Sequence, residues 1–171
     1  EKPYGPSPAA RQAILASAGV APRYADESMT TLAQQLAAHE GVAVSQIIIG
    51  TGSGELLKMA GLLAKTAHCD GELIASRPTY EELPVFAARL GLTVRWVASD
   101  AQHRHDLAAM RAAINGQTRL VYVCNPNNPT GTAVARDALL GPVVRHMAEQ
   151  RIGSVIVMEG SDVVGILTAN D

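Results

Sequence analysis

Hydrophobic and polar positions along this chain follow two alternating periods. Apolar residues recur at helical spacing in five stretches, 7–19, 31–42, 53–67, 81–91 and 106–116. Short runs rich in β-branched and aliphatic residues lie between them, at 46–52, 71–80, 92–98 and 118–124, the second with a turn at its end. Strands that alternate with helices predict an α/β fold with a mostly parallel sheet covered on both faces.

Helix boundaries carry local signals that support this pattern. The first helix has a Ser-Pro start and ends at Gly19, and Gly41 and Gly91 follow two others. Ser53 is a candidate N-cap, and Glu55 suits the first helical turn.

Composition narrows the class of protein. The chain has 171 residues, enough for one domain with a sizeable core, and 47% are apolar, which excludes disorder. A net charge of -2 without a basic cluster argues against nucleic acid as a partner. No apolar run reaches the roughly 20 residues of a membrane span, and the start does not resemble a signal peptide.

Cys69 and Cys124 are expected to be reduced thiols in the cytoplasm. Because the first residue is Glu, we expect the chain to begin inside a longer parent or after processing.

Three polar sequences follow predicted strands: GTGSGE (50–55), RPTYEE (77–82) and NPNNPTG (125–131). Ligands of open α/β sheets bind beyond the carboxyl ends of the strands, so these sequences are expected to converge. GTGSGE opens a helix, where free N–H groups and the helix dipole favour an anion; the alternative is a tight turn with a Ser cap. It is neither a Walker A loop nor a dinucleotide fingerprint.

The other two sequences offer a ring and an amide. Tyr80 is placed to stack on a planar ring, or else it is a half-buried core tyrosine. Asn125 and Asn128 each precede proline, which favours extended backbone and gives their amides defined directions. The alternative is an Asx-type turn that ends at Gly131.

These residues together resemble a known family. KPYGPSP, RYADESMTTLAQQLA, IIIGTGSGELL, RPTYEE and VCNPNNPTGT, over residues 1–140, are similar to the N-terminal part of a fold-type-I aminotransferase that depends on pyridoxal 5'-phosphate. The most similar branch is that of the histidinol-phosphate aminotransferases. The resemblance implies a three-layer α/β/α large domain, truncated, with residues 1–30 as an N-terminal arm.

The resemblance also implies roles for single residues. The backbone at Ser53, Gly54 and Glu55 would hold the cofactor phosphate, Tyr80 would stack on the pyridine ring, and Asn128 would donate to the ring's phenolic oxygen. Tyr24 would reach the phosphate of the neighbouring subunit's cofactor, and Tyr4 would line the substrate pocket. The implied state is a homodimer, and the implied reaction transfers an amino group between an amino acid or amine phosphate and a 2-oxo acid.

The chain departs from the family where catalysis needs it most. The family attaches the cofactor to a lysine downstream of NPTG, but lysine occurs here only at Lys2, Lys58 and Lys65. We therefore assign no catalytic residue, and interpret Lys58 as solvated or paired within the helical layer. The family's C-terminal arginine has no counterpart. Glu159 is the nearest candidate for the aspartate that pairs with the ring nitrogen, a substitution we do not favour.

The tail, 141–171, resembles part of a CBS domain, with MAEQRIGS, VIVM and VVGILTAND in order. That resemblance implies an adenine nucleotide contacted by Thr168 and Asp171. A helix at 142–151 and a strand at 153–158 would continue the sheet, with VVGIL as an antiparallel edge strand. The scattered histidines, including His103 and His105, and the triplet at 68–70 predict neither a metal site nor a catalytic triad.

Three hypotheses follow. The chain is an aminotransferase-derived domain that retains cofactor binding without catalysis; or a regulatory module that senses an adenine nucleotide through its tail; or a chimera, natural or engineered, that folds without activity.

Overall fold

The computed structural model describes residues 5–20, 26–67 and 71–134, and the backbone of two further strands at 154–159 and 162–168. The predicted helix at 142–151 lies outside these residues. The chain divides into two units, Glu1–Ile49 and Gly50–Asp171.

The first unit contains two helices, α1 (Pro8–Ser17) and α2 (Asp26–Glu40), and the short 3-10 helix η1 (Val44–Gln46). The Ser-Pro start of α1 is confirmed, because the Ser7 side chain accepts a hydrogen bond from the Ala10 N–H at 3.2 Å. Helix α2 begins five residues before the predicted start at 31, and Gly41 follows it with a φ of 69°. That left-handed conformation suits glycine and ends the helix.

The predicted buried strand at 46–52 is wrong. Residues 47–50 form no strand, and the Ile48 side chain is 57% exposed. A β-branched run becomes a strand only where a neighbouring strand accepts its backbone hydrogen bonds, and the described sheet offers this segment no partner.

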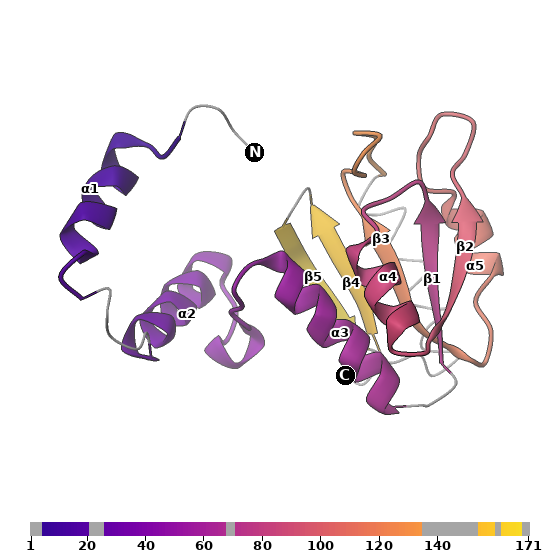
Figure 1. Cartoon of the computed structure of the whole chain (residues 1–171), viewed down its shortest axis with the longest axis horizontal. Helices are drawn as coiled ribbons and strands as arrows, with labels where there is room; N and C mark the ends of the chain where they lie inside the picture. Colours follow the sequence, from indigo (N-terminus) through magenta and orange to yellow (C-terminus); the bar gives the residue numbers. More distant parts are fainter. Residues whose placement is uncertain (1–4, 21–25, 68–70, 135–153, 160–161, 169–171) are drawn as a thin grey trace. The chain divides into compact units, whose positions relative to one another are not determined.

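The second unit is built on one five-stranded sheet in the order β2-β1-β3-β4-β5 (Figure 1). The strands are β1 (Glu72–Arg77), β2 (Thr93–Ala98), β3 (Thr118–Cys124), β4 (Ser154–Glu159) and β5 (Asp162–Thr168). The first four run parallel and β5 pairs antiparallel with β4. The predicted mostly parallel sheet with an antiparallel edge strand is confirmed.

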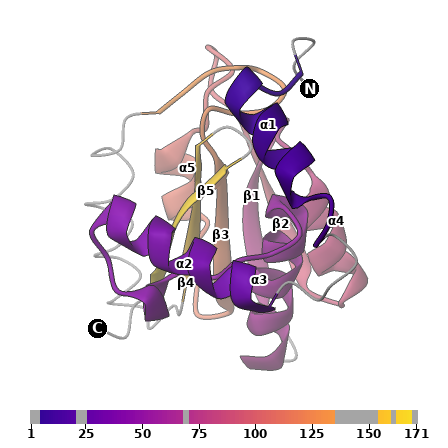
Figure 2. The same cartoon turned by 90° about the vertical axis from the view of Figure 1, so that its left-hand side faces the viewer.

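Helices cover both faces of this sheet, as predicted. Helices α3 (Ser53–Ala67) and α4 (Glu82–Arg89) pack on one face, and α5 (Leu107–Ala112) packs on the other (Figure 2). Helix α5 is shorter than its predicted range of 106–116, and the Asp106 side chain caps it by accepting from the Ala109 N–H at 2.9 Å. Alternate strand residues therefore enter two cores, as a parallel sheet buried on both faces requires.

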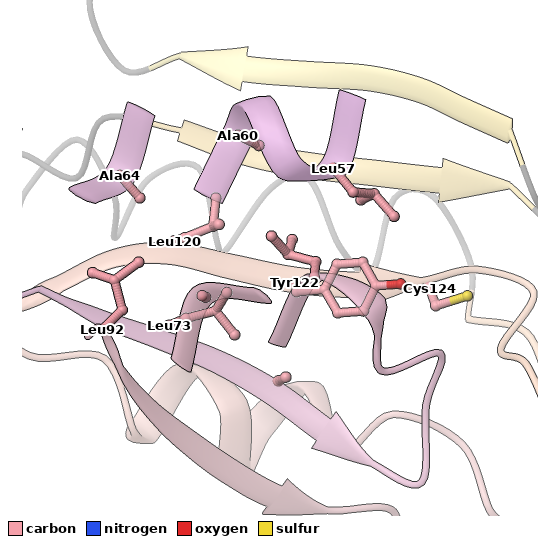
Figure 3. Close-up of a cluster of buried hydrophobic side chains, with 11 residues drawn as sticks. Leu57, Ala60, Ala64, Leu73, Leu92, Leu120, Tyr122 and Cys124 are labelled. Atoms are coloured by element: carbon pink, nitrogen blue, oxygen red, sulfur yellow. The ribbon is translucent and has the colours of Figure 1, made fainter. Parts of the chain in front are cut away.

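The larger core lies under α3 and α4 (Figure 3). Leu57 and Ala60 of α3 face Leu73, Leu120 and the other buried members, which include Leu83, Ala87, Tyr122 and Cys124. The Tyr122 hydroxyl points along β3 toward Cys124, at the end of the strand, and burial raises the pKa of that hydroxyl. The core thus extends to the carboxyl end of β3.

An ion pair between buried Glu72 and partly exposed Arg95 lies at the opposite edge of the sheet. Glu72, at the start of β1, accepts two hydrogen bonds from Arg95, at 2.8 and 3.1 Å, and one from the Asn115 amide at 2.7 Å. The bonds from Arg95 are the main cause that lowers the pKa of Glu72. No helix in the described part of the chain is long and apolar enough to cross a membrane.

Candidate cofactor site at the carboxyl ends of the strands

Two of the predicted polar sequences, RPTYEE and NPNNPTG, meet at one edge of the sheet because strands β1 and β3 are parallel neighbours, and the loop after β2 joins them there. GTGSGE follows no strand and reaches this edge through the start of helix α3, where Gly54 lies close to Glu82. The carboxyl ends of β1, β2 and β3 lie at Arg77, Ala98 and Cys124, and each is followed directly by one of the loops described below. In an open α/β sheet this edge is where ligands bind.

Helix α3 begins at this edge with the sequence GTGSGE. Ser53 is the first residue of the helix, so the predicted N-cap position is one residue too late. The Glu55 carboxylate turns back and accepts hydrogen bonds from the Thr51 N–H at 2.6 Å and the Thr51 hydroxyl at 3.0 Å. These bonds lower the pKa of Glu55. The Glu55 side chain therefore shapes the loop, and only its backbone remains available to a ligand.

The first turn of α3 keeps free hydrogen-bond donors. The N–H groups of Ser53 and Gly54 have no acceptor among the residues the structure describes. Unpaired N–H groups at a helix start, together with the positive end of the helix dipole, form a favourable site for an anion.

Tyr80 follows β1 and lies close to this helix start. Its hydroxyl donates to Glu82 Oε2 at 2.6 Å, and Glu82 Oε1 contacts Lys58 Nζ at 3.1 Å. A Cβ added to Gly54 would lie only 2.8 Å from Glu82 Oε1, so the same carboxylate also lies close to the first turn of α3. Tyr80 is 38% exposed, so part of the residue is open to solvent beside the helix start.

Asn127 joins the loop after β3 to the loop after β1. Its amide donates to the Pro78 carbonyl at 3.0 Å and to Thr130 Oγ1 at 2.9 Å, and its carbonyl oxygen accepts from the Thr79 hydroxyl at 2.8 Å. The Asn127 side chain is 2% exposed. This buried amide fixes the position of its neighbour, Asn128, relative to Tyr80.

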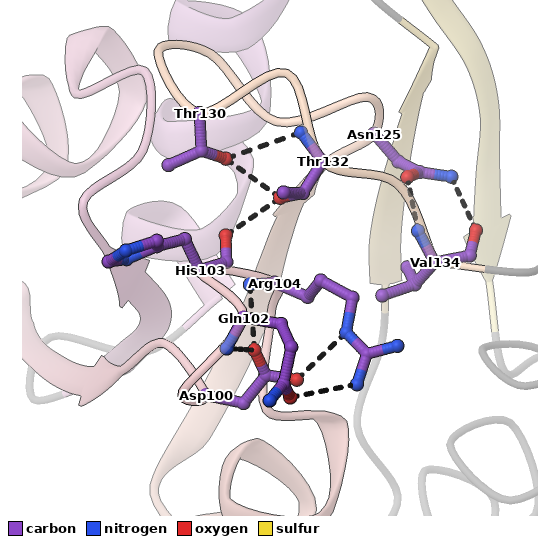
Figure 4. Close-up of polar contacts among 8 residues, drawn as sticks. All are labelled: Asp100, Gln102, His103, Arg104, Asn125, Thr130, Thr132 and Val134. Carbon is purple, nitrogen blue, oxygen red and sulfur yellow. Dashed lines mark hydrogen bonds and ion pairs between the residues drawn. The ribbon is translucent and has the colours of Figure 1, made fainter.

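The two asparagines that precede proline have different environments. Asn125 makes two hydrogen bonds with the backbone of Val134, both at 2.9 Å, and these close the base of the loop (Figure 4). Asn128 is exposed, and its side chain makes no hydrogen bond within the described ranges. The Asn128 amide is thus free to serve a ligand, whereas Asn125 is occupied in shaping the loop.

The loop after β2 completes this edge. Asp100 accepts from the N–H groups of Gln102 and Arg104 and from Arg104 Nε, each at 2.9 Å (Figure 4). The Thr132 hydroxyl donates to the His103 carbonyl at 2.7 Å and so connects this loop to the one after β3. The three loops after β1, β2 and β3 are therefore linked by hydrogen bonds.

The two histidines of the sequence HRH differ in environment. His103 is exposed, whereas His105 is 4% exposed, and its Nε2 lies 2.7 Å from the Cys124 carbonyl. Burial lowers the pKa of His105. The part of the chain that the structure describes contains no cluster of three metal-ligating side chains.

Several predicted site residues cannot be placed. Tyr4, Tyr24 and Asp171 lie outside the described residues. Thr168 ends β5 opposite Ser154, and Glu159 ends β4 at the same edge as Cys124, but only their backbone is described. The roles predicted for these residues stay predictions.

The structure adds residues that sequence reasoning missed. These are Glu82 and Asn127, which connect the loops. Lys58, which the sequence predicts to be solvated or paired, contacts Glu82 of the neighbouring helix α4. The spacing of NPNNPTG gave no sign that its middle asparagine is the buried one.

Unpaired N–H groups at a helix start, a partly exposed tyrosine and an exposed amide lie at one sheet edge, an arrangement typical of an α/β domain that suits a planar, phosphorylated ligand. These groups fit pyridoxal 5'-phosphate, since the unpaired N–H groups of Ser53 and Gly54 suit its phosphate and the aromatic ring of Tyr80 suits its pyridine ring.

Comparison with known proteins agrees with this class. The family profile of the class I and II aminotransferases matches residues 1–152, and the chain belongs to that family. The chain is 45% identical over 142 residues to the histidinol-phosphate aminotransferase of Moorella thermoacetica, covering 82% of this chain and 36% of that protein. It is 42% identical over 139 residues to the aromatic amino acid aminotransferase of Rhodococcus jostii, covering 81% and 38%.

A solved structure extends the similarity to three dimensions. The histidinol-phosphate aminotransferase of Sinorhizobium meliloti, in complex with pyridoxal-5'-phosphate, superposes with a TM-score of 0.73 at 30% identity, covering 88% of this chain and 39% of that one. The chain thus spans less than two fifths of the length of these relatives. They give no support to the CBS resemblance of the tail, and the boundary at 140/141 stays a prediction.

Proposed function

We propose that this chain forms the cofactor-binding part of a pyridoxal-phosphate-dependent aminotransferase of the histidinol-phosphate or aromatic amino acid type. One observation carries the proposal. Glu82 and Asn127 join the start of α3, the Tyr80 loop and the Asn128 loop into one continuous group at the sheet edge. The similarity of the chain to a histidinol-phosphate aminotransferase and to an aromatic amino acid aminotransferase supports the same type of enzyme.

Each residue contributes by binding or orientation. The first-turn N–H groups of Ser53, Gly54 and Glu55 would hold the phosphate, and Tyr80 would pack against the pyridine ring. The Asn128 amide would donate to the phenolic oxygen. When bound, the cofactor supplies the electron-withdrawing ring that allows an amino group to move between an amino acid and a 2-oxo acid.

The proposal includes a homodimer, in which Tyr24 reaches the phosphate bound by the partner subunit and Tyr4 lines the substrate pocket. A cytoplasmic location remains a prediction from the two cysteines. Within the chain, Lys58 is engaged with Glu82, and Lys65 lies in the last turn of α3, at the opposite end of the helix from Ser53. We therefore expect neither lysine to attach the cofactor covalently.

A titration of the purified chain with pyridoxal phosphate tests the proposal. We expect one saturable site per chain by absorbance, with binding strongly weakened in Tyr80→Ala and in Asn128→Ala. After borohydride treatment, mass spectrometry is expected to find no lysine adduct. An unsaturable titration would refute cofactor binding, and wild-type affinity in both variants would refute the roles of Tyr80 and Asn128. A stoichiometric adduct on Lys58 or Lys65 would show that the chain retains a covalent attachment point.

A further inference from the structure

Glu82 lies where three parts of the site meet. It is the first residue of α4, and its carboxylate contacts the Tyr80 hydroxyl at 2.6 Å and Lys58 Nζ of α3 at 3.1 Å. The third contact is with Gly54, where a Cβ would lie 2.8 to 3.2 Å from the carboxylate atoms. Glycine at position 54 thus leaves the volume that the Glu82 carboxylate occupies.

The protonation states of this group favour a strong contact. The hydrogen bond from Tyr80 and the bond to Lys58 lower the pKa of Glu82, and the bond to Glu82 raises the pKa of Tyr80. At neutral pH a protonated hydroxyl therefore donates to an ionised carboxylate, which is a charge-assisted hydrogen bond of the short, strong kind. Lys58 offsets the negative charge of Glu82 beside the predicted phosphate site.

We propose that Glu82 is a positioning residue, which fixes the Tyr80 ring in the orientation that receives the cofactor ring. This inference rests on the proposed function. A tyrosine side chain turns about two bonds, and a half-exposed ring without a bond at its far end samples several orientations. A bond at the hydroxyl removes that freedom before binding, so less conformational entropy is lost when the ligand arrives.

The test compares four single variants of the whole chain, and the double variant Glu82→Ala/Tyr80→Phe, in the same pyridoxal phosphate titration. Glu82→Ala removes the acceptor, Glu82→Gln keeps an acceptor oxygen without the charge, and Tyr80→Phe keeps the ring without the hydroxyl. Glu81→Gln is the matched control: Glu81 is adjacent and carries the same charge, but its carboxylate contacts Arg77 at 3.4 Å and not Tyr80.

We expect Glu82→Ala and Tyr80→Phe each to raise the Kd about 3- to 10-fold, the range for one side chain that must be ordered on binding. The double variant should be no weaker than Tyr80→Phe alone, because both changes remove the same contact. Glu82→Gln should recover part of the affinity, and Glu81→Gln should bind like the wild type.

A second measurement needs no cofactor. Ultraviolet titration of the tyrosines should show one hydroxyl whose pKa falls in Glu82→Gln and whose signal is missing in Tyr80→Phe.

If the wild type binds pyridoxal phosphate and Glu82→Ala binds it with a Kd within twofold of the wild-type value, the positioning role is refuted and the proposed function stands. An equal loss in Glu81→Gln also refutes it, because charge alone would then explain the effect. If the wild type does not bind, the proposed function fails and the positioning role fails with it.

Discussion

Replacing Asn127 with alanine should weaken the fold, whereas the same change at Asn128 should weaken only ligand binding. Asn127 is 2% exposed, and its side chain makes hydrogen bonds to Pro78, Thr79 and Thr130. Each such bond contributes a net of about 0.5 to 1.5 kcal/mol, so the loss of three should cost about 1.5–4.5 kcal/mol. For a chain of this length that corresponds to a fall in Tm of roughly 3–18 °C.

Urea denaturation followed by circular dichroism measures this difference. The midpoint should fall in Asn127→Ala with an unchanged m-value, because the surface exposed on unfolding stays the same. Asn128→Ala is the control, since its exposed side chain has no hydrogen bond within the described ranges, and its stability should stay within about 0.5 kcal/mol of the wild type. A loss below about 1 kcal/mol for Asn127→Ala, or equal losses in both variants, would refute the assignment of the buried amide as the link between the loops.

Three further perturbations test other parts of the fold. Burial holds the pKa of His105 in the folded chain below its ordinary value of 6.5, so the unfolded chain takes up a proton first as pH falls. The contribution of neutral His105 to the free energy of unfolding should be complete above pH 6.5 and decline below it. The decline should be less steep in His105→Gln. Glu72→Gln should lower the free energy of unfolding by about 1–3 kcal/mol at pH 7, a loss limited by the partial exposure of Arg95. The difference in stability between this variant and the wild type should disappear as pH falls from 4.5 through the lowered pKa of Glu72. Gly131→Ala should cost about 1–2 kcal/mol in a thermal melt, because its φ of 69° is left-handed; an unchanged Tm would contradict this.

The sequence predicts those elements of the fold whose signals are local. Helix α3 occupies the whole predicted range, Ser53–Ala67, because its apolar periodicity is continuous and glycines precede it. The run at 46–52 shows the limit of such signals, since its β-branched residues are typical of strands but a strand also needs a neighbour.

The candidate site likewise contains residues that local sequence signals indicate and residues that only the folded structure reveals. Tyr80 and the two asparagines that precede proline are candidates from the sequence because each follows a predicted strand and carries a suitable side chain, and the family resemblance alone singles out Asn128. Glu82 and Asn127 are not, because their importance lies in contacts with residues that are distant in sequence or on another element. Asn127 bonds to Thr79, 48 positions away, and periodicity carries no information on such a pair. Only the packing of the two loops reveals it.

The close approach of Glu82 to Gly54 has a consequence for sequence variation among relatives. A side chain at position 54 and a carboxylate at position 82 compete for the same space, with 2.8 Å between them if both are present. The two positions should therefore covary: where evolution places a larger residue at 54, we expect a shorter or uncharged residue at 82 and a different partner for the tyrosine. In laboratory evolution, a change at either position should be accepted most readily when the other changes with it.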